Sequence, residues 1–226
     1  MMRIVLLGPP GSGKGTQAGA LARRRAIAHI ASGDILRANV KEGTELGRRA
    51  APYMERGELV PDELILDMMA KRLAEPDAAE GYALDGFPRT VAQAEALDGR
   101  LSGMQQRLQA VVYLEVPEEE LLRRLSGRRI CPNCNAIYQL ATMAPKREGI
   151  CDACGAGLIQ RKDEQPEVVH NRMQVYARET EPLLAYYRRT GLLHEVDGTI
   201  GVDNVLAEID GIVRESAAAV AGKREA

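Results

Sequence analysis

Short apolar stretches alternate with longer amphipathic stretches along most of the chain. The apolar stretches are rich in residues that suit buried strands, at positions 2–7, 26–30, 81–89, 110–116 and 192–196, and the one at 81–89 ends in a charged turn. Between them, apolar residues recur at helical spacing, which predicts helices at 17–23, 62–74, 91–101, 118–126 and 202–220, and others ending at Lys41, following Thr44, and starting near Pro166 and Pro182. This alternation predicts an α/β fold, with a mostly parallel sheet covered on both faces.

Single residues predict several helix boundaries. Ser32 or Asp34 can cap the helix that ends at Lys41, and Thr44 can cap the next one. We expect Pro52 to break the register of that second helix. Pro61 fits the first turn of the helix at 62–74.

Composition and charge limit the possible partners. The chain has 226 residues, of which 45% are hydrophobic and 27% charged, and its net charge is −2. A buried core is feasible, in one domain with insertions or in two small domains. The charge argues against bulk binding of nucleic acid or of a membrane surface. Without an apolar run of about 18 residues or a secretory signal pattern, we expect a cytoplasmic protein. No long exposed apolar face is evident, which favours a monomer.

A glycine-rich segment, Gly8–Thr16, joins the first strand to the first helix. In this context, glycines let backbone N–H groups close on an anion, and the helix N-terminus adds partial positive charge. Lys14 would carry a full charge to nucleotide phosphates, and Thr16 a hydroxyl near magnesium. Gly15 stands between them and departs from the general phosphate-loop pattern. The alternative is a turn that binds no ligand.

The four cysteines form two C-x2-C pairs separated by sixteen residues, at Cys131, Cys134, Cys151 and Cys154. This spacing fits a four-thiolate zinc site. Four thiolates leave no open coordination position, so the zinc would be structural and would hold a small inserted module with too little core to fold alone. Free cysteines or two disulfides are the alternatives, and an iron–sulfur cluster is a weaker one.

Further candidate chemistry depends on Asp85 and a set of arginines. Ligands of parallel sheets bind at the carboxyl ends of the strands, so Asp85 and the glycine-rich segment should face one crevice. Asp85 could hold magnesium through water, or could only cap the turn at Gly86. Phosphoryl transfer needs many cations, and arginines stand at element ends or in the cysteine module: Arg37, Arg89, Arg124, Arg128, Arg161 and Arg172. The three histidines are scattered, which gives no support to histidine general-base catalysis.

Together these motifs resemble the adenylate kinase family of nucleoside monophosphate kinases, in its long-lid, zinc-containing bacterial form. Gly8–Thr16 is similar to the family's G-x-P-G-x-G-K-G-T loop, Gly15 included. Ser32–Arg37 is similar to its [ST]-G-D-x-[LF]-R segment. Leu84–Thr90 is similar to its signature, with Gln93 at the position that reads adenine. The resemblance covers essentially the whole chain.

The resemblance implies a phosphate-loop core with a five-stranded parallel sheet flanked by helices, at residues 1–30, 61–127 and 161–226. It implies a helical AMP-binding insertion at 31–60 and a zinc-stabilised lid at 128–160 that closes over ATP. The implied reaction is reversible transfer of the γ-phosphoryl group of Mg-ATP to AMP, giving two ADP. Structural zinc and magnesium would be the cofactors.

Site residues follow by position from the same resemblance. The ATP site would comprise Gly11, Ser12, Gly13, Lys14, Gly15, Thr16, Arg124, Arg128 and Tyr138. The AMP site would comprise Ser32, Gly33, Arg37, Glu58, Leu59, Val60, Gly86, Arg89, Gln93, Arg161 and Arg172. The catalytic charges would be Lys14, Arg89, Arg124, Arg128, Arg161 and Arg172. Asp85 would hold the water bound to magnesium, and the four cysteines would hold zinc.

Three positions depart from the family pattern. Ser32 replaces the commoner threonine but keeps the hydroxyl, Glu164 stands where a second aspartate is usual, and Gln139 stands where histidine is frequent. A lid-locking hydrogen bond at Glu164 could therefore differ. A kinase that accepts UMP or CMP is the nearest alternative, although Gln93 and the cysteine module favour adenine. A phosphate-loop switch that docks nucleic acid is disfavoured by the charge of −2 and by 4% aromatic residues.

Overall fold

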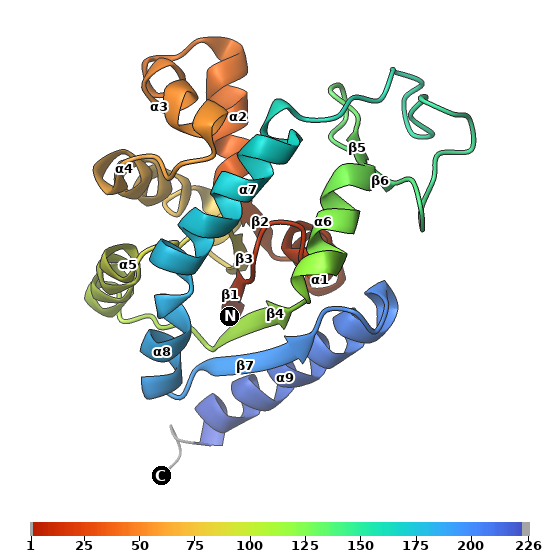
Figure 1. The fold of residues 1–226 in the computed structure, drawn as a ribbon. Coiled ribbons are helices and arrows are strands. Elements are labelled where there is room, and N and C mark those ends of the chain that lie inside the picture. Colours follow the sequence, from red (N-terminus) through yellow and green to blue (C-terminus); the bar gives the residue numbers. More distant parts are fainter. Residues whose placement is uncertain (1, 223–226) are drawn as a thin grey trace.

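The computed structural model describes residues 2–222 and the side chains of residues 2–217. Its centre is a five-stranded parallel sheet in the order β2-β3-β1-β4-β7 (Figure 1). The strands are β1 (Met2–Leu7), β2 (Ala28–Ala31), β3 (Gly81–Asp85), β4 (Ala110–Glu115) and β7 (Leu193–Asp197). All five predicted strands are confirmed. The second begins two residues late, because Ala26 ends the preceding helix with a φ of 52° and cannot start a strand.

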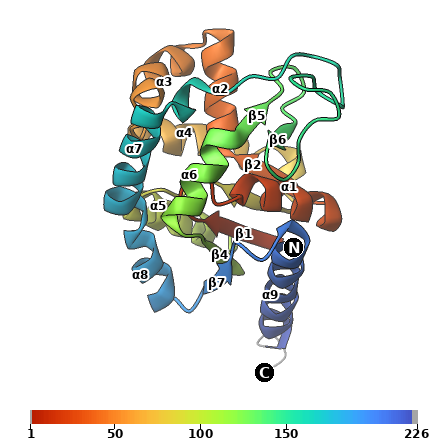
Figure 2. The ribbon, with the colours of Figure 1, turned by 45° about the vertical axis from the view of Figure 1, so that its right-hand side comes forward.

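Helices cover both faces of this sheet (Figures 1 and 2). Their bounds are α1 (Lys14–Arg25), α2 (Ser32–Glu42), α3 (Glu45–Arg56), α4 (Asp62–Arg72), α5 (Val91–Gly103), α6 (Glu118–Gly127), α7 (Pro166–Val175), α8 (Pro182–Arg189) and α9 (Val202–Gly222). Short 3-10 turns lie at Pro76–Ala78 and Lys162–Glu164, and a π-helical turn at Tyr176–Thr180 joins α7 to α8. Among residues 2–222, no helix combines the length and apolar character that crossing a bilayer requires.

The core has two halves, one on each face of the sheet. Along β1, Ile4 and Leu6 belong to the half that includes residues of α1 and α9, whereas Val5 and Leu7 belong to the half that includes residues of α4, α5 and α8. Successive strand residues point to opposite faces, so a strand buried on both faces must be apolar throughout. This is why residues 4–7 of β1 form an unbroken apolar run in the sequence, which Arg3 precedes.

Two peripheral segments leave the core. The first is the helical pair α2–α3, between β2 and α4. The second is the lid, which we define as residues 128–160, between α6 and α7; it holds a two-stranded antiparallel sheet of β5 (Arg128–Ile130) and β6 (Ile137–Gln139). Figures 1 and 2 both show the helical pair and the lid at the same end of the molecule.

The boundary predictions have mixed outcomes. Thr44 caps α3, because its Oγ1 accepts a hydrogen bond from Gly47 N at 3.0 Å. The predicted cap of α2 is wrong: its N-cap position is Ala31, and the Ser32 hydroxyl donates to Gly86 O at 2.6 Å instead. The prediction for Pro52 is also wrong, because α3 continues through it to Arg56. Tyr53 and Met54, which follow the proline, pack against the core, and this packing outweighs the lost hydrogen bond.

Gly47 allows α2 and α3 to pack at close range. A Cβ atom at this position would lie 2.1 Å from the backbone oxygen of Asn39. Replacing Gly47 by alanine is therefore expected to force the two helices apart, at a cost of about 1–3 kcal/mol of stability. For a domain of this size the melting temperature should fall by roughly 2–4 °C per kcal/mol. Differential scanning calorimetry measures this change.

Gly99 provides the matched control for this substitution. It lies in α5, and a Cβ there would meet nothing within 4 Å. Gly99→Ala is expected to leave stability unchanged or to raise it by up to about 1 kcal/mol, because alanine is the better helix former. Equal melting temperatures for the two variants would contradict the proposed close contact at Gly47.

Candidate active site

The glycine-rich segment forms a loop between β1 and α1. Gly8 has a φ of 146°, and a Cβ there would lie 2.9 Å from Leu114 O and 2.7 Å from Ser12 Oγ. Gly13 has a φ of 96° and is the N-cap of α1, with no side-chain cap. The first N–H groups of α1 are thus left for a ligand at a helix N-terminus, which is the usual arrangement for binding phosphate.

Lys14 is the first residue of α1, and its side chain reaches back to this loop. Its Nζ donates hydrogen bonds to Gly8 O at 2.6 Å and to Pro9 O at 2.9 Å. Burial lowers the pKa of Lys14 to about 8; the charges of neighbouring arginines act in the same direction, and Asp85 opposes them. The ammonium group is therefore poorly solvated at neutral pH, and an anion nearby would stabilise it.

The structure explains the unusual Gly15. A Cβ at this position would lie 3.0 Å from Asp85 Oδ2, so a larger residue would press on this carboxylate at the end of β3. Burial alone would raise the pKa of Asp85, but the interactions with His29 and Lys14 outweigh burial and lower it. His29 Nε2 lies 3.8 Å from Asp85 Oδ2. Asp85 thus remains ionised beside the loop, as a ligand of hydrated magnesium must.

Two pockets meet at the carboxyl ends of the strands. The larger one is lined by the loop and by residues of α6 and the lid, and it contains the predicted residues Gly11, Ser12, Gly13, Lys14, Gly15, Thr16, Asp85, Arg124, Arg128, Tyr138 and Arg161. The second pocket lies towards α2 and contains Ser32, Gly33, Arg37, Glu58, Leu59, Val60, Gly86, Arg89, Gln93 and Arg172. Every predicted nucleotide-site residue therefore lines one pocket or both.

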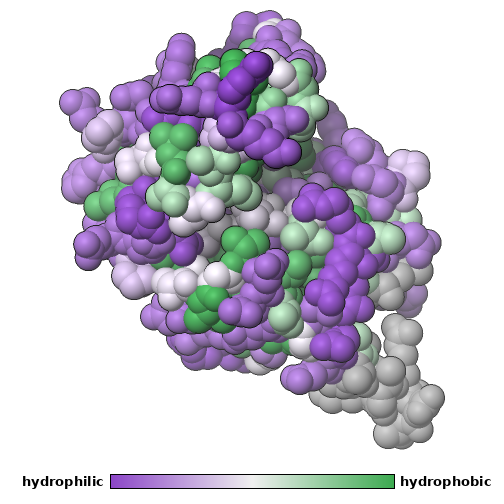
Figure 3. Space-filling view, turned by 90° about the vertical axis from the view of Figure 1, so that its right-hand side faces the viewer, coloured by the Kyte–Doolittle hydropathy of each residue, from purple (hydrophilic) through white to green (hydrophobic). Residues whose placement is uncertain are grey.

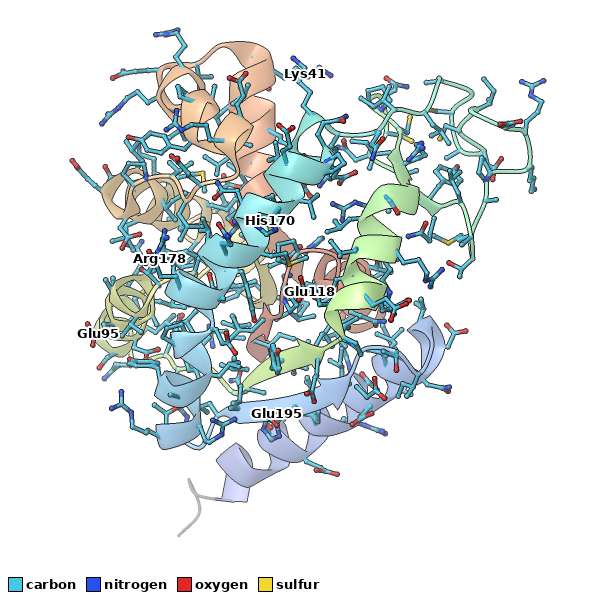
Figure 4. All side chains as sticks on the ribbon, viewed as in Figure 1. Lys41, Glu95, Glu118, His170, Arg178 and Glu195 are labelled. Carbon is cyan, nitrogen blue, oxygen red and sulfur yellow. The ribbon has the colours of Figure 1, made fainter. Side chains whose placement is uncertain are left out.

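Cationic residues stand where the two pockets join. Lys14, Arg37, Arg89 and Arg172 line both of them. Figure 4 shows nitrogen atoms of side chains in the space between α6 and α7. Two anionic ligands placed in the two pockets would thus meet between shared positive charges.

Arg161 and Arg172 carry positive charge at positions that are partly shielded from water. Burial and the charges of Arg37 and Arg128 lower the pKa of Arg161 to about 10. Burial, with repulsion from Arg128 and Arg89, does the same for Arg172. Arg172 NH1 lies 3.0 Å from Asp163 Oδ2, which partly offsets this repulsion.

Two further predicted arginines, Arg124 and Arg128, line the larger pocket and are held in place by other residues. Arg124 donates through Nε to Glu120 Oε1 at 2.7 Å and through NH2 to Gly198 O at 2.9 Å. Arg128 forms an ion pair with Glu164, which is 2% exposed. Glu164, which departs from the family pattern, therefore fixes the position of Arg128.

The lid carries a cluster that suits a metal ion. The four Sγ atoms of Cys131, Cys134, Cys151 and Cys154 lie within 4.8 Å of one another, and none is in a disulfide. Tyr138 packs against this cluster. Its hydroxyl accepts from Asp152 N at 2.7 Å and lies 3.5 Å from Cys151 Sγ. Four converging thiols are the donor set of a closed structural zinc site.

Three polar residues at or near the second pocket are absent from the site residues that the sequence predicts. Asp163 pairs with Arg172, and Asp62 and Thr90 contact Gln93. Thr90 caps α5 and accepts from Gln93 N three residues along the chain, whereas the partners of Asp163 and Asp62 lie in other elements, and Asp62 is 31 residues from Gln93 in sequence. Since periodicity and capping rules describe neighbours along the chain, no such signal could have found the pair formed by Asp62 and Gln93.

The phosphate loop on a parallel sheet, joined to a second cationic pocket, defines a P-loop phosphotransferase with two phosphorylated substrates. A family model described as adenylate kinase matches residues 6–192. An adenylate kinase of Lachnospira eligens is 53% identical over 208 residues, which are 92% of this chain and 98% of that protein. The chain belongs to the adenylate kinase family, and it is an ATP:AMP phosphotransferase.

Other relatives give the same result. An adenylate kinase of Methanocella arvoryzae is 49% identical over 96% of this chain and 100% of its own length. One of Thermotoga maritima is 51% identical over 92% of this chain and 96% of its own length. The cysteine cluster in the lid is consistent with the long-lid, zinc-containing type.

Proposed function

We propose that the larger pocket holds the phosphates of Mg-ATP and that the second pocket holds AMP. Lys14 and the backbone of the loop bind the donor phosphates, with Arg124, Arg128 and Tyr138 on the ATP side. Ser32, Arg37 and Gln93 bind AMP, together with the other residues that line its pocket. Arg89, Arg161 and Arg172 stabilise the phosphoryl group between the two nucleotides.

The observation that carries this proposal is the junction of the two pockets. Lys14, Arg37, Arg89 and Arg172 line both, so a phosphoryl group moving from one nucleotide to the other stays among fixed positive charges. Phosphoryl transfer offers little covalent chemistry to the protein, and positioning with electrostatic stabilisation supplies most of the rate. The same arrangement in reverse gives ATP and AMP from two ADP.

The proposed division of the chain follows from these pockets. We assign residues 1–30, 61–127 and 161–226 to the core, 31–60 to the AMP-binding insertion and 128–160 to the zinc-binding lid; residues 1 and 223–226 of this assignment lie outside the described residues. Movement of the lid and of the insertion over the pockets would exclude water, which otherwise competes with AMP as the acceptor. The core would hold Lys14, Asp85 and Arg89 in constant relation to one another during this movement.

Two metal ions fit the residues present. The converging thiols of Cys131, Cys134, Cys151 and Cys154 would hold zinc as a structural ion. The ionised Asp85 would hold water bound to the magnesium of Mg-ATP. Magnesium supplies neutralisation of phosphate charge, whereas the chain's own arginines orient the phosphates.

We also propose a cytoplasmic monomer. In the face shown by Figure 3, hydrophobic residues lie in small groups among hydrophilic ones. Stable obligate dimers usually bury a larger continuous apolar surface. Sedimentation of the purified chain tests the monomer, and a dimer at micromolar concentration would overturn it.

The test of the reaction is a panel of donor and acceptor nucleotides varied independently. We expect ADP formation from ATP and AMP, followed by a coupled assay, with UMP and CMP as poor acceptors. Gln93→Leu should lose most of the selectivity for AMP over UMP. Turnover with UMP or CMP in preference to AMP would overturn the assignment of the second pocket.

Affinity for ATP is expected to fall above about pH 8. Burial lowers the pKa of Lys14 from 10.5 to about 8 in the free protein, and bound phosphates favour the charged amine and raise it. Below about pH 7 the amine is charged with or without ATP, so affinity does not depend on it. Above about pH 8 binding requires uptake of a proton, and affinity drops by up to about tenfold per pH unit. Titration calorimetry between about pH 7 and pH 10 measures this.

Lys14→Arg is the control for the pH profile. Its guanidinium remains charged over the whole range, so the dissociation constant of ATP should vary much less with pH. A profile in the arginine variant as steep as that of the parent protein would mean that another group titrates.

A further inference from the structure

The amide of Gln93 is fixed from both sides. Gln93 is 2% exposed and lines the second pocket. Its Oε1 accepts a hydrogen bond from Arg89 N at 2.8 Å, and its Nε2 donates to Asp62 Oδ1 at 2.7 Å. A backbone N–H can only donate and a carboxylate can only accept, so both partners require the same orientation of the amide.

Asp62 is held in turn by Thr90. Asp62 is the first residue of α4, and its Oδ2 accepts from Thr90 Oγ1 at 2.9 Å. The same hydroxyl caps α5 by accepting from Gln93 N at 3.1 Å. Asp62, Thr90 and Gln93 thus form a closed network that joins the starts of α4 and α5. Within the part of the chain that the structure describes, Asp62 and Thr90 are not among the residues that line the pocket.

The network leaves a defined hydrogen-bonding pattern for a ligand. A primary amide has two N–H donors and two acceptor lone pairs. One donor is used by Asp62 and one lone pair by Arg89 N, so one of each remains. Adenine presents an amino donor beside a ring-nitrogen acceptor, which complements this pair. Hypoxanthine has the same size but presents a carbonyl acceptor beside an N–H donor, and would need the amide reversed.

We propose that Asp62 is a positioning residue that sets the base preference of the acceptor site, by preventing the Gln93 amide from turning to the orientation that suits a 6-oxopurine. The inference rests on the proposed function, in which Gln93 faces the base of AMP. Reversal would place the amide carbonyl against the Asp62 carboxylate and the amide NH2 against Arg89 N–H, so both ends of the buried Gln93 amide would lose these partners. Cytosine has the same order of donor and acceptor as adenine, so this network excludes IMP and not CMP.

The test compares AMP and IMP as acceptors, with ATP as the donor. Asp62→Ala is expected to lower kcat/KM for AMP by about tenfold while that for IMP stays unchanged or rises, so that the AMP preference falls about tenfold or more. The KM for ATP should not change. Asp62→Asn keeps a carbonyl oxygen that can accept from Gln93 Nε2 and should retain most of the preference. The double variant with Gln93→Ala should be no less selective than Gln93→Ala alone, because the two residues act as one unit.

The outcomes separate this inference from the proposed function. Equal losses with AMP and IMP in Asp62→Ala would mean a general structural effect and would overturn the role of Asp62. If Gln93→Ala changes the AMP preference but Asp62→Ala does not, the role of Asp62 is overturned while the assignment of the AMP pocket stands. If Gln93→Ala leaves the AMP preference unchanged, both the pocket assignment and the inference fail. Circular dichroism and melting temperature establish that each variant is folded.

Discussion

Replacing Lys14 by methionine is expected to lower kcat by about a thousandfold without lowering the melting temperature. The loss follows because Lys14 lines both pockets and is the charged group of the phosphate loop. Methionine has similar length but no charge, so it leaves the donor phosphates without this cation in the transition state. A coupled assay at saturating ATP and AMP measures kcat, and calorimetry measures the melting temperature.

The stability part of this prediction follows from the pKa of Lys14. Folding lowers that pKa from 10.5 to about 8, so at neutral pH the folded state holds an ammonium group that burial disfavours. Between about pH 8 and pH 10.5 the unfolded chain binds more protons at this position, and the lysine's unfavourable contribution fades as pH rises. The melting temperature of Lys14→Met relative to the parent should therefore be highest near neutral pH and decline towards pH 10. A variant that melts well below the parent at pH 7 would show that the three loop contacts of Nζ matter more than its burial.

Loss of the cysteine cluster is expected to unfold the lid while the sheet remains folded. The buried side chains of the lid cluster are Cys131, Tyr138 and Cys151, so without a bound metal the segment has very little core. Structural zinc commonly contributes on the order of 10 kcal/mol to the folding of such a module. Cys131→Ser should therefore expose the amides of residues 128–160 to rapid hydrogen exchange and lower the melting temperature by more than about 5 °C. Elemental analysis should find about one zinc per chain in the parent protein and much less in the variant.

Leu140→Ser is the control for this experiment. Leu140 lies in the same lid but is 45% exposed and is not part of the cysteine cluster. It should keep its zinc, and its amides should exchange as slowly as those of the parent. An unchanged melting temperature and unchanged exchange in Cys131→Ser would contradict a structural metal, as would the absence of metal from protein purified without chelator.

The sequence predicts the parts of this fold that depend on local pattern. Strands buried on both faces are mostly apolar, so β1 and β4 are recognisable as short runs in spite of Arg3 and Glu115. The loop at Gly8–Thr16 and the cysteine pairs are equally local, because turn geometry and metal ligation impose fixed spacings. The cap at Thr44 is predictable for the same reason, because its bond to Gly47 N spans three residues.

The contacts that local patterns cannot predict are those between distant elements. Ser32 has the residue type of a helix cap, but Gly86 O lies within 2.6 Å in the fold and takes its hydroxyl. Pro52 has the residue type of a helix breaker, but packing of the following turn keeps α3 intact. The reason for Gly15 is the carboxylate of Asp85, which only the pairing of β1 with β3 brings close.

Repulsion among the arginines makes the thermal stability of the enzyme depend on the anions around it. Arg161 and Arg172 have pKa values lowered to about 10, because burial and like charges act on them together. In the proposed function, nucleotide phosphates between them would act as their counterion, so the folded state and the nucleotides would stabilise each other by mass action. The resistance of the protein to heat should therefore follow the concentration of adenine nucleotides around it. An enzyme that interconverts these nucleotides would therefore be most stable where they are abundant.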